Sequence, residues 1–423
     1  MLQSRRFFRS SSSNLNSVGK MMGFEANIYA KPHDLILTRG ANSILYDDIN
    51  NKQYIDFTSG IAVASLGHAN PKIAEVIQKQ STKLLHTSNL FNNIEGLQLC
   101  QSLIETTKQF GGQHDASAVY LCNSGTEANE AALKFAKKYG VQINPNKHGI
   151  LAFEQSFHGR TMGSLSVTSN PKYRLQFGSG VPNTTFLDIS DDLSTIESFI
   201  SENASQFAAL IVEPVQGEGG VLPLPAEKLI SIKRVCVEND ILVIYDEIQC
   251  GIGRTGKLWA HSYLPKEAHP DLFTTAKALG NGYPIGATIM NSKVNSVLKV
   301  GDHGCTYGGN PMASAIACSV LSTIANDQFL NEVGKKAQVF VTELRRLQNK
   351  YPVIRDVRGR GLFIGVEFQD NPAELIKVAR KNGLLVVGAS RNTIRIVPPL
   401  TVENSVIDAG LEILEKSIRE IYL

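Results

Sequence analysis

Short apolar runs, glycine-rich loops and stretches with helical apolar spacing follow one another between residues 119 and 290. The runs of strand length cover 119–121, 149–153, 208–212 and 241–245. Continuous apolar runs of this kind are typical of strands that are buried on both faces of a sheet. Because helices alternate with the strands, the strands are expected to pair in parallel through right-handed crossovers. The pattern predicts an α/β fold with a mostly parallel central sheet.

The pattern changes toward both ends of the chain. Residues 44–57 hold two apolar and aromatic segments around a turn rich in Asp and Asn, which predicts a hairpin. Helical spacing is present at 71–85 and 95–107, and a long charged helix is expected over 329–350. Two apolar segments, GLFIGVEF and TIRIVPPL, and helices near 372–381 and 402–421 complete a smaller α+β domain. The expected divisions are 23–80 for an N-terminal segment that packs with the small domain, 81–328 for the large domain and 329–423 for the small domain.

The first 22 residues, MLQSRRFFRSSSSNLNSVGKMM, are rich in Arg and Ser and contain no acid. This composition is typical of a mitochondrial transit peptide, because a secretory signal would need a longer apolar core. The mitochondrial matrix is therefore the expected location. The alternative is a disordered basic tail with no targeting role. We leave this segment out of the predicted fold.

Charge and cysteine usage exclude several kinds of partner. The chain has 423 residues and a formal net charge of +3, and the basic N-terminal segment accounts for that excess. A nearly neutral body argues against nucleic acid as a partner. No apolar run approaches the roughly 18 residues of a membrane helix. The six cysteines form no C-x-x-C pair and no zinc-like spacing, which favours free thiols in a reducing compartment and no metal site.

One acid and one lysine mark the expected centre of the chemistry. The run 241–245 ends on Asp246 and Glu247, and ligands of open α/β sheets bind beyond the carboxyl ends of strands. Lys277 follows a second apolar run, just before several glycines. A lysine in small, apolar surroundings can carry an aldehyde as a Schiff base, and a carboxylate can keep a pyridine nitrogen protonated. The pair therefore favours Schiff-base chemistry on a pyridine cofactor.

A strongly marked helix start follows the strand at 119–121. Ser124 and Glu127 fit a capping box within the sequence NSGTEANEAALK. The free backbone N–H groups and hydroxyls of this turn form an anion site that suits a phosphate. The alternative is an ordinary N-cap without a ligand.

Two further loops follow predicted strands and carry polar or aromatic groups. In SFHGRT, Phe157 can stack on a planar ring and Arg160 can bind a carboxylate through two hydrogen bonds. In EPVQGEGG, Glu213 and Glu218 lie among glycines. The alternative is that Phe157 belongs to the core and that Arg160 is solvated.

The glycines at 251, 253 and 256 match G-x-G-x-x-G, the pattern of a dinucleotide site. The context does not fit, because residues 246–250 separate the strand from the glycines and no clear helix opens after Gly256. The same stretch fails as a P-loop, since Leu258 stands where a Ser or Thr must hold magnesium. We expect neither kind of nucleotide site here.

Over residues 27–423 the chain resembles the class III pyridoxal-phosphate-dependent aminotransferases. The resemblance rests on NSGTEANEAALK, SFHGRT, VEPVQGEGG, YDEIQCGIGRTG, TTAKALGNGYPIGA and TYGGNP, in that order. It implies the type I fold of these transferases, pyridoxal 5′-phosphate as cofactor and a homodimer with shared active sites. The segments GIAVASLGH and HTSNLF are most similar to members that act on N-acetylornithine.

The resemblance also implies residue roles. Lys277 resembles the lysine that binds the cofactor, Asp246 resembles the partner of the ring nitrogen, and Gln249 resembles the contact to the ring 3-oxygen. Thr306 resembles a phosphate ligand from a second subunit, and Cys305 stands where serine is usual. The remaining cofactor contacts implied are Ser124, Gly125, Thr126, Phe157, Glu247 and Ile248, and the remaining substrate contacts implied are Arg160, Glu218 and Arg395.

The implied reaction is transfer of the δ-amino group of N2-acetylornithine to 2-oxoglutarate, in arginine and ornithine biosynthesis. Arg160 would bind a carboxylate far from the reacting amine, and Arg395 would bind the α-carboxylate of glutamate. Glu218 would pair with Arg395 when glutamate is absent; the alternative is a purely structural salt bridge. Ornithine or 4-aminobutyrate as amino donor, a non-transaminating enzyme of the same fold, and a non-catalytic member are the other possibilities.

Overall fold

The computed structural model describes residues 19–32, 34–178, 180 and 183–423. The expected transit peptide, 1–22, lies outside the described residues except for its last four positions. A seven-stranded sheet forms the centre, in the order β4-β12-β11-β10-β7-β5-β6. Its strands are β4 (Ala116–Cys122), β5 (Gly149–Phe153), β6 (Thr184–Leu187), β7 (Phe207–Val212), β10 (Leu242–Asp246), β11 (Leu272–Thr275) and β12 (Gly286–Asn291).

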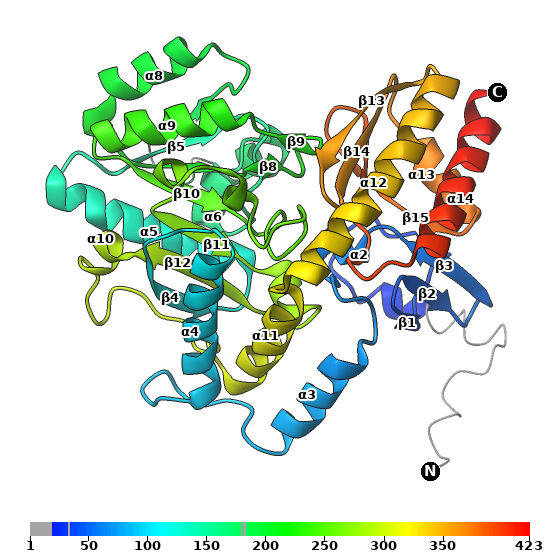
Figure 1. The fold of residues 1–423 in the computed structure, drawn as a ribbon, viewed down its shortest axis with the longest axis horizontal. Helices are drawn as coiled ribbons and strands as arrows, with labels where there is room; N and C mark the ends of the chain where they lie inside the picture. The colour runs from blue at the N-terminus through cyan, green and yellow to red at the C-terminus, as the bar shows by residue number, and fades with distance from the viewer. Residues whose placement is uncertain (1–18, 33, 179, 181–182) are drawn as a thin grey trace.

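Among these seven strands β12 alone is antiparallel to its neighbours, so the prediction of a mostly parallel sheet is confirmed. Alternate residues of each strand enter two separate cores. Ile150 and Ala152 pack with helix α5 (Gly125–Ile143), whereas Leu151 and Phe153 pack on the opposite face. The apolar runs are continuous because both faces are covered, as Figure 1 shows for α5 and α9 (Ala226–Glu238).

The C-terminal part forms a second, smaller sheet with helices on one side. Its strands are antiparallel, in the order β13-β14-β17-β16. Figure 1 shows helix α12 (Asp327–Lys350) running from the end of α11 (Pro311–Ile324) along this sheet. The other elements are β13 (Ile354–Arg360), β14 (Phe363–Phe368), α13 (Ala373–Lys381), β16 (Val387–Ala389), β17 (Thr393–Ile396) and α14 (Asn404–Tyr422).

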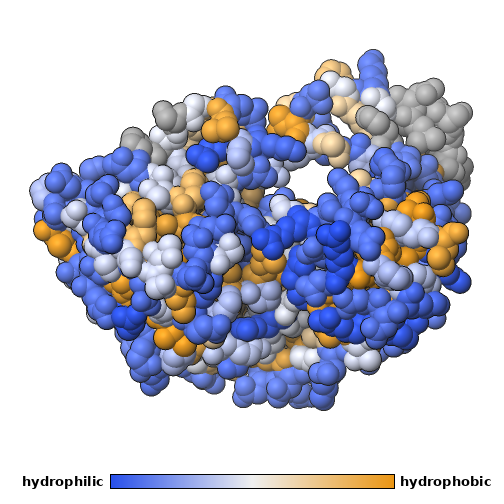
Figure 2. Space-filling model, turned by 90° about the horizontal axis from the view of Figure 1, so that it is seen from above, coloured by the Kyte–Doolittle hydropathy of each residue, from blue (hydrophilic) through white to orange (hydrophobic). Residues whose placement is uncertain are grey.

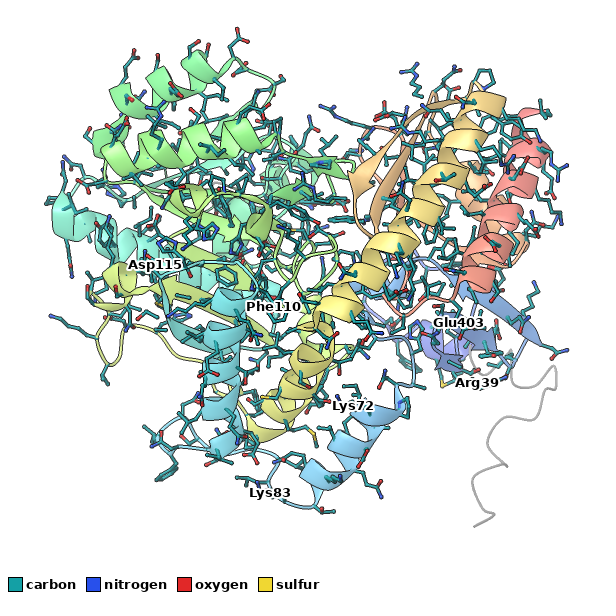
Figure 3. The ribbon with its side chains drawn as sticks, viewed as in Figure 1. Arg39, Lys72, Lys83, Phe110, Asp115 and Glu403 are labelled. Atoms are coloured by element: carbon teal, nitrogen blue, oxygen red, sulfur yellow. The ribbon has the colours of Figure 1, made fainter. Side chains whose placement is uncertain are left out.

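The N-terminal segment contacts both parts of the molecule. The expected hairpin is present as β2 (Ile44–Asp47) and β3 (Lys52–Asp56), with β1 (Arg39–Ala41) added at its edge. Strand β3 pairs in parallel with β15 (Leu384–Leu385) of the C-terminal part. Helix α3 (Pro71–Ser81) lies instead beside α11, where Lys72 Nζ donates to Thr323 Oγ1 over 2.9 Å; Lys72 is labelled in Figure 3.

The glycine-rich loop after Asp246 connects the large and small parts through one buried cation. Arg254 is fully buried, and its guanidinium donates to the carbonyls of Leu362 and Pro398 and to Ser65 Oγ. Burial lowers the pKa of Arg254 to about 9. A Cβ on Gly251 would lie 2.7 Å from the carbonyl oxygen of Glu247, so close packing accounts for this glycine without a nucleotide.

The remaining elements are short, apart from two helices. They are α2 (Ser59–Ala62), α4 (Ile94–Gln109), α6 (Met162–Ser166), α7 (Pro171–Arg174), α8 (Leu193–Glu202), β8 (Val215–Gln216), β9 (Leu222–Pro223) and α10 (Ser292–Asn295). Figure 2 shows one face of the molecule, which is mainly hydrophilic with apolar residues in small patches. Within the described ranges, none of the helices has the length and apolar character that crossing a bilayer requires.

Candidate active site

A cavity of about 400 Å³ opens beyond the carboxyl ends of β5, β7, β10 and β11. This is the edge of an open α/β sheet where ligands bind. The sequence-predicted residues that line it are Ser124, Gly125, Thr126, Phe157, Arg160, Asp246, Ile248, Gln249 and Lys277. Residues at or after the ends of four different strands, β4, β5, β10 and β11, are thus brought to one place. Glu218, Glu247, Cys305, Thr306 and Arg395 are not among the lining residues.

Lys277 begins a short 3₁₀ helix directly after β11 and projects from the floor of the cavity. Its backbone has a φ of 42°, in the left-handed region that a lysine seldom adopts. Burial and the nearby charge of Arg395 lower the pKa of Lys277 to about 8, although Asp246, Glu213 and Glu218 act in the opposite direction. A larger fraction of neutral amine is therefore present near pH 7, and a neutral amine is the form that attacks a carbonyl.

Asp246 ends β10 and is held by three donors. Asn129 Nδ2 donates to Asp246 Oδ2 over 2.8 Å, and His158 Nδ1 lies 2.8 Å from the same oxygen. The backbone N–H of Ile248 donates to Oδ1 over 3.0 Å. Asp246 is only 4% exposed, so these bonds keep its carboxylate oriented. A buried carboxylate at this position can pair with a protonated ring nitrogen.

The expectation of a cofactor contact from Glu247 does not agree with its position. Its carboxylate accepts hydrogen bonds from the backbone N–H groups of Ala260 and His261, each over 2.8 Å. His261 Nδ1 also lies 2.8 Å from Glu247 Oε1. Asp246 thus lines the cavity, whereas Glu247, the first residue after β10, is fully buried and faces the core behind it. The physical role of Glu247 is to fix the loop that contains Ala260.

The start of helix α5 has the predicted cap, and it offers free donors to an anion. Ser124 Oγ accepts from the N–H of Glu127, which leaves the N–H groups of Gly125 and Thr126 without an intrahelical acceptor. Thr126 Oγ1 lies 2.8 Å from Thr161 Oγ1. A Cβ on Gly125 would lie 2.8 Å from the side chain of Ile248, so the backbone here is approached closely. Helix dipole and free donors together favour a phosphate.

Phe157 and Arg160 line the cavity from the loop after β5. Glu213 holds this loop, because its Oε1 accepts from the N–H of Phe157 over 2.9 Å and its Oε2 accepts from the N–H of Gly217 over 3.0 Å. Burial raises the pKa of Glu213 to about 7. The guanidinium carbon of Arg160 lies 3.4 Å from the centre of the Tyr173 ring, a cation–π contact.

Arg395 reaches the site from strand β17 of the small domain. Its Nη1 donates to Gln249 Oε1 over 2.9 Å, and its Nη2 donates to Glu218 Oε2 over 3.2 Å. Arg395 is 2% exposed, and burial lowers its pKa while Glu218 and Glu213 act to raise it. Its Nε has no hydrogen-bond partner among the described residues. A substrate carboxylate would satisfy this cation if Glu218 moved away.

Cys305 and Thr306 lie in a loop outside the cavity of their own chain. Asn123 Nδ2 donates to Cys305 Sγ over 2.9 Å, so the thiol contacts a residue of the cavity wall without lining the cavity. The side chain of Thr306 is exposed. Within one chain, these two residues do not reach the position of a bound ligand.

The arrangement fits pyridoxal phosphate. The N-terminus of α5 suits its phosphate, Asp246 suits its ring nitrogen, and Lys277 suits its aldehyde. Among the described residues no cluster of His, Cys, Asp and Glu could hold a metal ion. The free N–H groups of α5, the Asp246 carboxylate and the Lys277 amine match a cofactor with one anionic group, one basic ring and one aldehyde.

Four contributors to the site were not predicted with these roles. His158 and Glu213 were noticed in their loops, but their bonds to Asp246 and to the Phe157 loop depend on tertiary packing. Asn129 faces Asp246 from the second turn of α5, and Tyr173 lies under Arg160. The position of Asn129 on the first two turns of α5, the helix whose start was expected to bind phosphate, could have indicated a residue that faces the site. Tyr173 gave no sequence signal.

The chain matches known proteins over nearly its whole length. Residues 26–418 match the family described as Aminotransferase class-III. Mitochondrial acetylornithine aminotransferase of Saccharomyces cerevisiae is 56% identical over 420 residues, with 99% of each chain covered. The enzyme of the same name from Eremothecium gossypii is 59% identical over 401 residues, with 95% of each chain covered.

Solved structures show the same similarity. Ornithine aminotransferase from Toxoplasma gondii ME49 has a TM-score of 0.88 at 30% identity, with 96% of this chain and 95% of that chain covered. N-acetylornithine aminotransferase from Stenotrophomonas maltophilia K279a has a TM-score of 0.78 at 32% identity, with 92% and 96% covered. With the cavity, the lysine and the anion site in the same fold, the chain belongs to the class III aminotransferases.

Proposed function

We propose that this protein transfers the δ-amino group of N2-acetylornithine to 2-oxoglutarate, giving N-acetylglutamate 5-semialdehyde and glutamate, in arginine biosynthesis. Its relatives of more than 50% identity carry the name of this activity. The observation that carries the proposal is the Arg395–Glu218 pair, together with Arg160, which lines the cavity and forms no ion pair with a carboxylate of the described residues. Arg160 is always available to a carboxylate, whereas Arg395 is available only when Glu218 leaves it. Such a pair of sites suits a monocarboxylate amino donor and a dicarboxylate acceptor.

The cofactor is pyridoxal 5′-phosphate, which supplies an aldehyde and an electron-withdrawing ring when bound. Lys277 Nζ removes the proton from the carbon that bears the δ-amino group of the donor. In the reverse half-reaction the same nitrogen delivers a proton to the former carbonyl carbon of the 2-oxo acid. Because its pKa is lowered to about 8, this amine can both take and release a proton near neutral pH.

Asp246 holds a proton at the ring nitrogen, and its three donors keep its carboxylate from turning. Phe157 and Gln249 line the cavity, where Phe157 would cover one face of the bound ring and Gln249 would donate its amide to the ring 3-oxygen. Ser124, Gly125, Thr126 and Ile248 line the phosphate end of the cavity. These contacts orient the reacting carbon without taking part in proton transfer.

Arg160 binds a substrate carboxylate at the end of the cavity away from Lys277, in both half-reactions. Arg395 binds the α-carboxylate of glutamate or 2-oxoglutarate after Glu218 has left it. When acetylornithine is bound, Glu218 neutralises Arg395 instead. Two substrates of different length can therefore use one reacting lysine.

The test is a panel of ω-amines, assayed for kcat/KM with 2-oxoglutarate as acceptor. We expect N2-acetylornithine to exceed ornithine and 4-aminobutyrate by at least about tenfold, a difference of about 1.4 kcal/mol in transition-state binding. A higher kcat/KM for ornithine or 4-aminobutyrate would identify that compound, and not N2-acetylornithine, as the amino donor. Absence of amino transfer from every ω-amine would point to a non-transaminating enzyme of the same fold.

A second copy of the chain is part of the proposal, because the cavity does not include Thr306. Leu90, Phe91 and Tyr307 are 86%, 68% and 62% exposed. Tyr307 follows Thr306 in the chain, and Asn89, which precedes Leu90, donates through Nδ2 to the carbonyl of Cys305 over 2.6 Å. Large apolar side chains that remain exposed in one chain are typical of an interface. We infer that this surface binds its counterpart in a homodimer and that Thr306 then reaches the phosphate site of the other subunit.

Mixed dimers test this arrangement. Chains carrying Lys277→Ala and chains carrying Thr306→Ala are coexpressed with different tags, and the doubly tagged species is purified. One of its two sites then has both Lys277 and Thr306 intact. We expect that site to recover wild-type affinity for pyridoxal phosphate, whereas the Thr306→Ala homodimer binds it more weakly. The shared site would be contradicted if the mixed dimer and the Thr306→Ala homodimer bound pyridoxal phosphate with equal affinity. It would also be contradicted if the wild-type protein sedimented as a monomer.

We place the protein in the mitochondrial matrix, since the most similar relatives are named as mitochondrial proteins. The basic N-terminal segment is consistent with import. A fluorescent protein fused behind residues 1–22 should enter mitochondria, and the same fusion with Arg5, Arg6 and Arg9 changed to Glu should remain outside. Uniform cytosolic fluorescence of the first fusion would contradict the location.

A further inference from the structure

Tyr173 connects the two arginines that are proposed to bind substrate carboxylates. Its ring lies under Arg160, with the guanidinium carbon 3.4 Å from the ring centre. Its hydroxyl donates to Glu218 Oε1 over 3.3 Å, and the other oxygen of Glu218 accepts from Arg395 Nη2 over 3.2 Å. An unbroken series of contacts therefore runs from Arg160 through Tyr173 and Glu218 to Arg395.

The local structure holds Tyr173 firmly in this position. It lies in α7, a single helical turn that Pro171 begins and that Asn170 caps by accepting from the N–H of Lys172. The ring also meets Phe157 edge to face, with ring centres 6.1 Å apart. Because two aromatic contacts and a helix cap fix the ring, its hydroxyl has little freedom to follow Glu218.

The charges around Tyr173 favour a neutral hydroxyl that donates. Burial and the nearby carboxylate of Glu218 raise the pKa of Tyr173, and Arg160 acts in the opposite direction. The hydroxyl therefore keeps its proton at neutral pH. A neutral donor stabilises Glu218 in the place where it pairs with Arg395.

We propose that Tyr173 is a positioning residue that holds Glu218 on Arg395 and so sets the preference between the monocarboxylate amino donor and the dicarboxylate acceptor. Acetylornithine needs Arg395 to be neutralised, which the Tyr173–Glu218 bond favours. A dicarboxylate must displace Glu218 from both partners before Arg395 can bind it. This inference rests on the proposed function, and it assigns the substrate selection of that site to a residue outside the cavity wall.

The variant Tyr173→Phe separates the ring contacts of the tyrosine from its hydrogen bond to Glu218. It keeps the ring under Arg160 and removes only the hydroxyl. Because the side chain of Glu218 is 30% exposed, we take the loss of this bond as that of an ordinary hydrogen bond, which shifts an equilibrium by about threefold to tenfold. We expect the dissociation constant of 2-oxoglutarate to fall by that factor in its half-reaction, while that of N2-acetylornithine changes by less than about twofold.

The half-reactions are followed separately in single turnovers, from the absorbance of the bound cofactor in the holoenzyme. Tyr173→Leu removes the ring as well, and it should weaken acetylornithine through the loss of the surface under Arg160. A double-mutant cycle with Glu218→Gln gives the decisive control. In that background Tyr173→Phe should have no further effect on 2-oxoglutarate, because its partner is already neutral. Melting temperatures of the holoenzymes verify that each variant is folded.

Two results would overturn the inference. One is a Tyr173→Phe enzyme whose two half-reactions both remain at wild-type affinity. The other is a weaker binding of 2-oxoglutarate, which would mean that the hydroxyl serves the dicarboxylate and not the ion pair. If the wild-type holoenzyme did not react with acetylornithine at all, the proposed function would fail first, and the two failures are therefore distinct.

Discussion

Glu218 Oε2 accepts a hydrogen bond from Arg395 Nη2 over 3.2 Å, although 177 positions separate the two residues in the chain. Glu218 comes from the glycine-rich loop after β7, and Arg395 comes from strand β17 of the small domain. The side chain of Arg395 is 3% exposed and that of Glu218 is 30% exposed. The acid is therefore the member of the pair that can move into solvent, and the cation is the member that stays.

The variant Glu218→Gln tests whether this ion pair serves substrate selection. A partly exposed pair of this kind contributes about 1 kcal/mol, so glutamate and 2-oxoglutarate should bind about fivefold more tightly after the change. Acetylornithine should bind more weakly, because the charge on Arg395 is left without a counterion. The ratio of dissociation constants is obtained from the two half-reactions. A lower melting temperature with an unchanged ratio would identify a purely structural salt bridge.

Lys277→Ala should bind pyridoxal phosphate and then fail to turn over. The phosphate site and Asp246 remain in place, but proton transfer by a positioned amine contributes about 10²- to 10⁴-fold in rate. We expect kcat to fall by at least about 10³-fold, with the ultraviolet and visible spectrum showing bound but unattached cofactor. Lys277→Arg is the matched control for charge, and it should be equally inactive. Steady turnover in the alanine variant would refute the assignment of Lys277.

The lowered pKa of Lys277 predicts how its attachment to the cofactor depends on pH. Only the neutral amine reacts, so for cofactor-free protein the rate should rise about tenfold per pH unit and level off near pH 8, the pKa of this lysine. An ordinary lysine would not level off until about pH 10.4. Stopped-flow absorbance between pH 6 and pH 10 measures the midpoint.

A matched variant identifies one cause of that midpoint. Arg395 is the charge that lowers the pKa of Lys277 after burial, so Arg395→Gln should move the midpoint to higher pH. Arg395→Lys keeps the positive charge and should move it much less. A midpoint that is the same in all three proteins would leave burial as the sole cause.

Asp246→Asn should reduce kcat far more than it reduces cofactor affinity. The amide cannot hold a proton at the ring nitrogen, although it has nearly the same shape, so we expect a loss of at least about 10³-fold, or 4 kcal/mol. Asn129→Ala is the graded control, because it removes one of the three donors to Asp246. A bond of this kind is worth about 1.5–3 kcal/mol, so its effect on kcat should be smaller. Equal losses in the two variants would contradict the role given to Asp246.

Local patterns predicted most of the fold because they record local physics. The apolar runs of β5, β7 and β10 are continuous since both faces of the sheet are covered, and the capping box of α5 requires only residues three positions apart. The antiparallel strand β12 was not predicted. Its direction depends on the glycine loop that precedes it, which sends the chain back between β4 and β11.

The candidate site was predictable where a group follows directly from its strand or helix. Asp246 at the end of β10 and the N–H groups of α5 are examples. Glu247 was expected as a cofactor contact from the resemblance, yet its carboxylate accepts from the backbone of Ala260 and His261 and does not line the cavity, whereas Asp246 does. Asp246 and Glu247 are adjacent at the end of β10, but they have different roles.

The sequence by itself determined which reactive groups this protein has, namely a lysine after one buried strand, an acid after another, a phosphate-binding helix start and two arginines. Only the tertiary structure decided how these groups act on one another. The pKa of Lys277 depends on its burial and on Arg395, and the Tyr173 hydroxyl lies beside Glu218 because α7 packs against the glycine-rich loop. The reason is physical, since charge interactions depend on distance and burial in space, and separation along the chain determines neither.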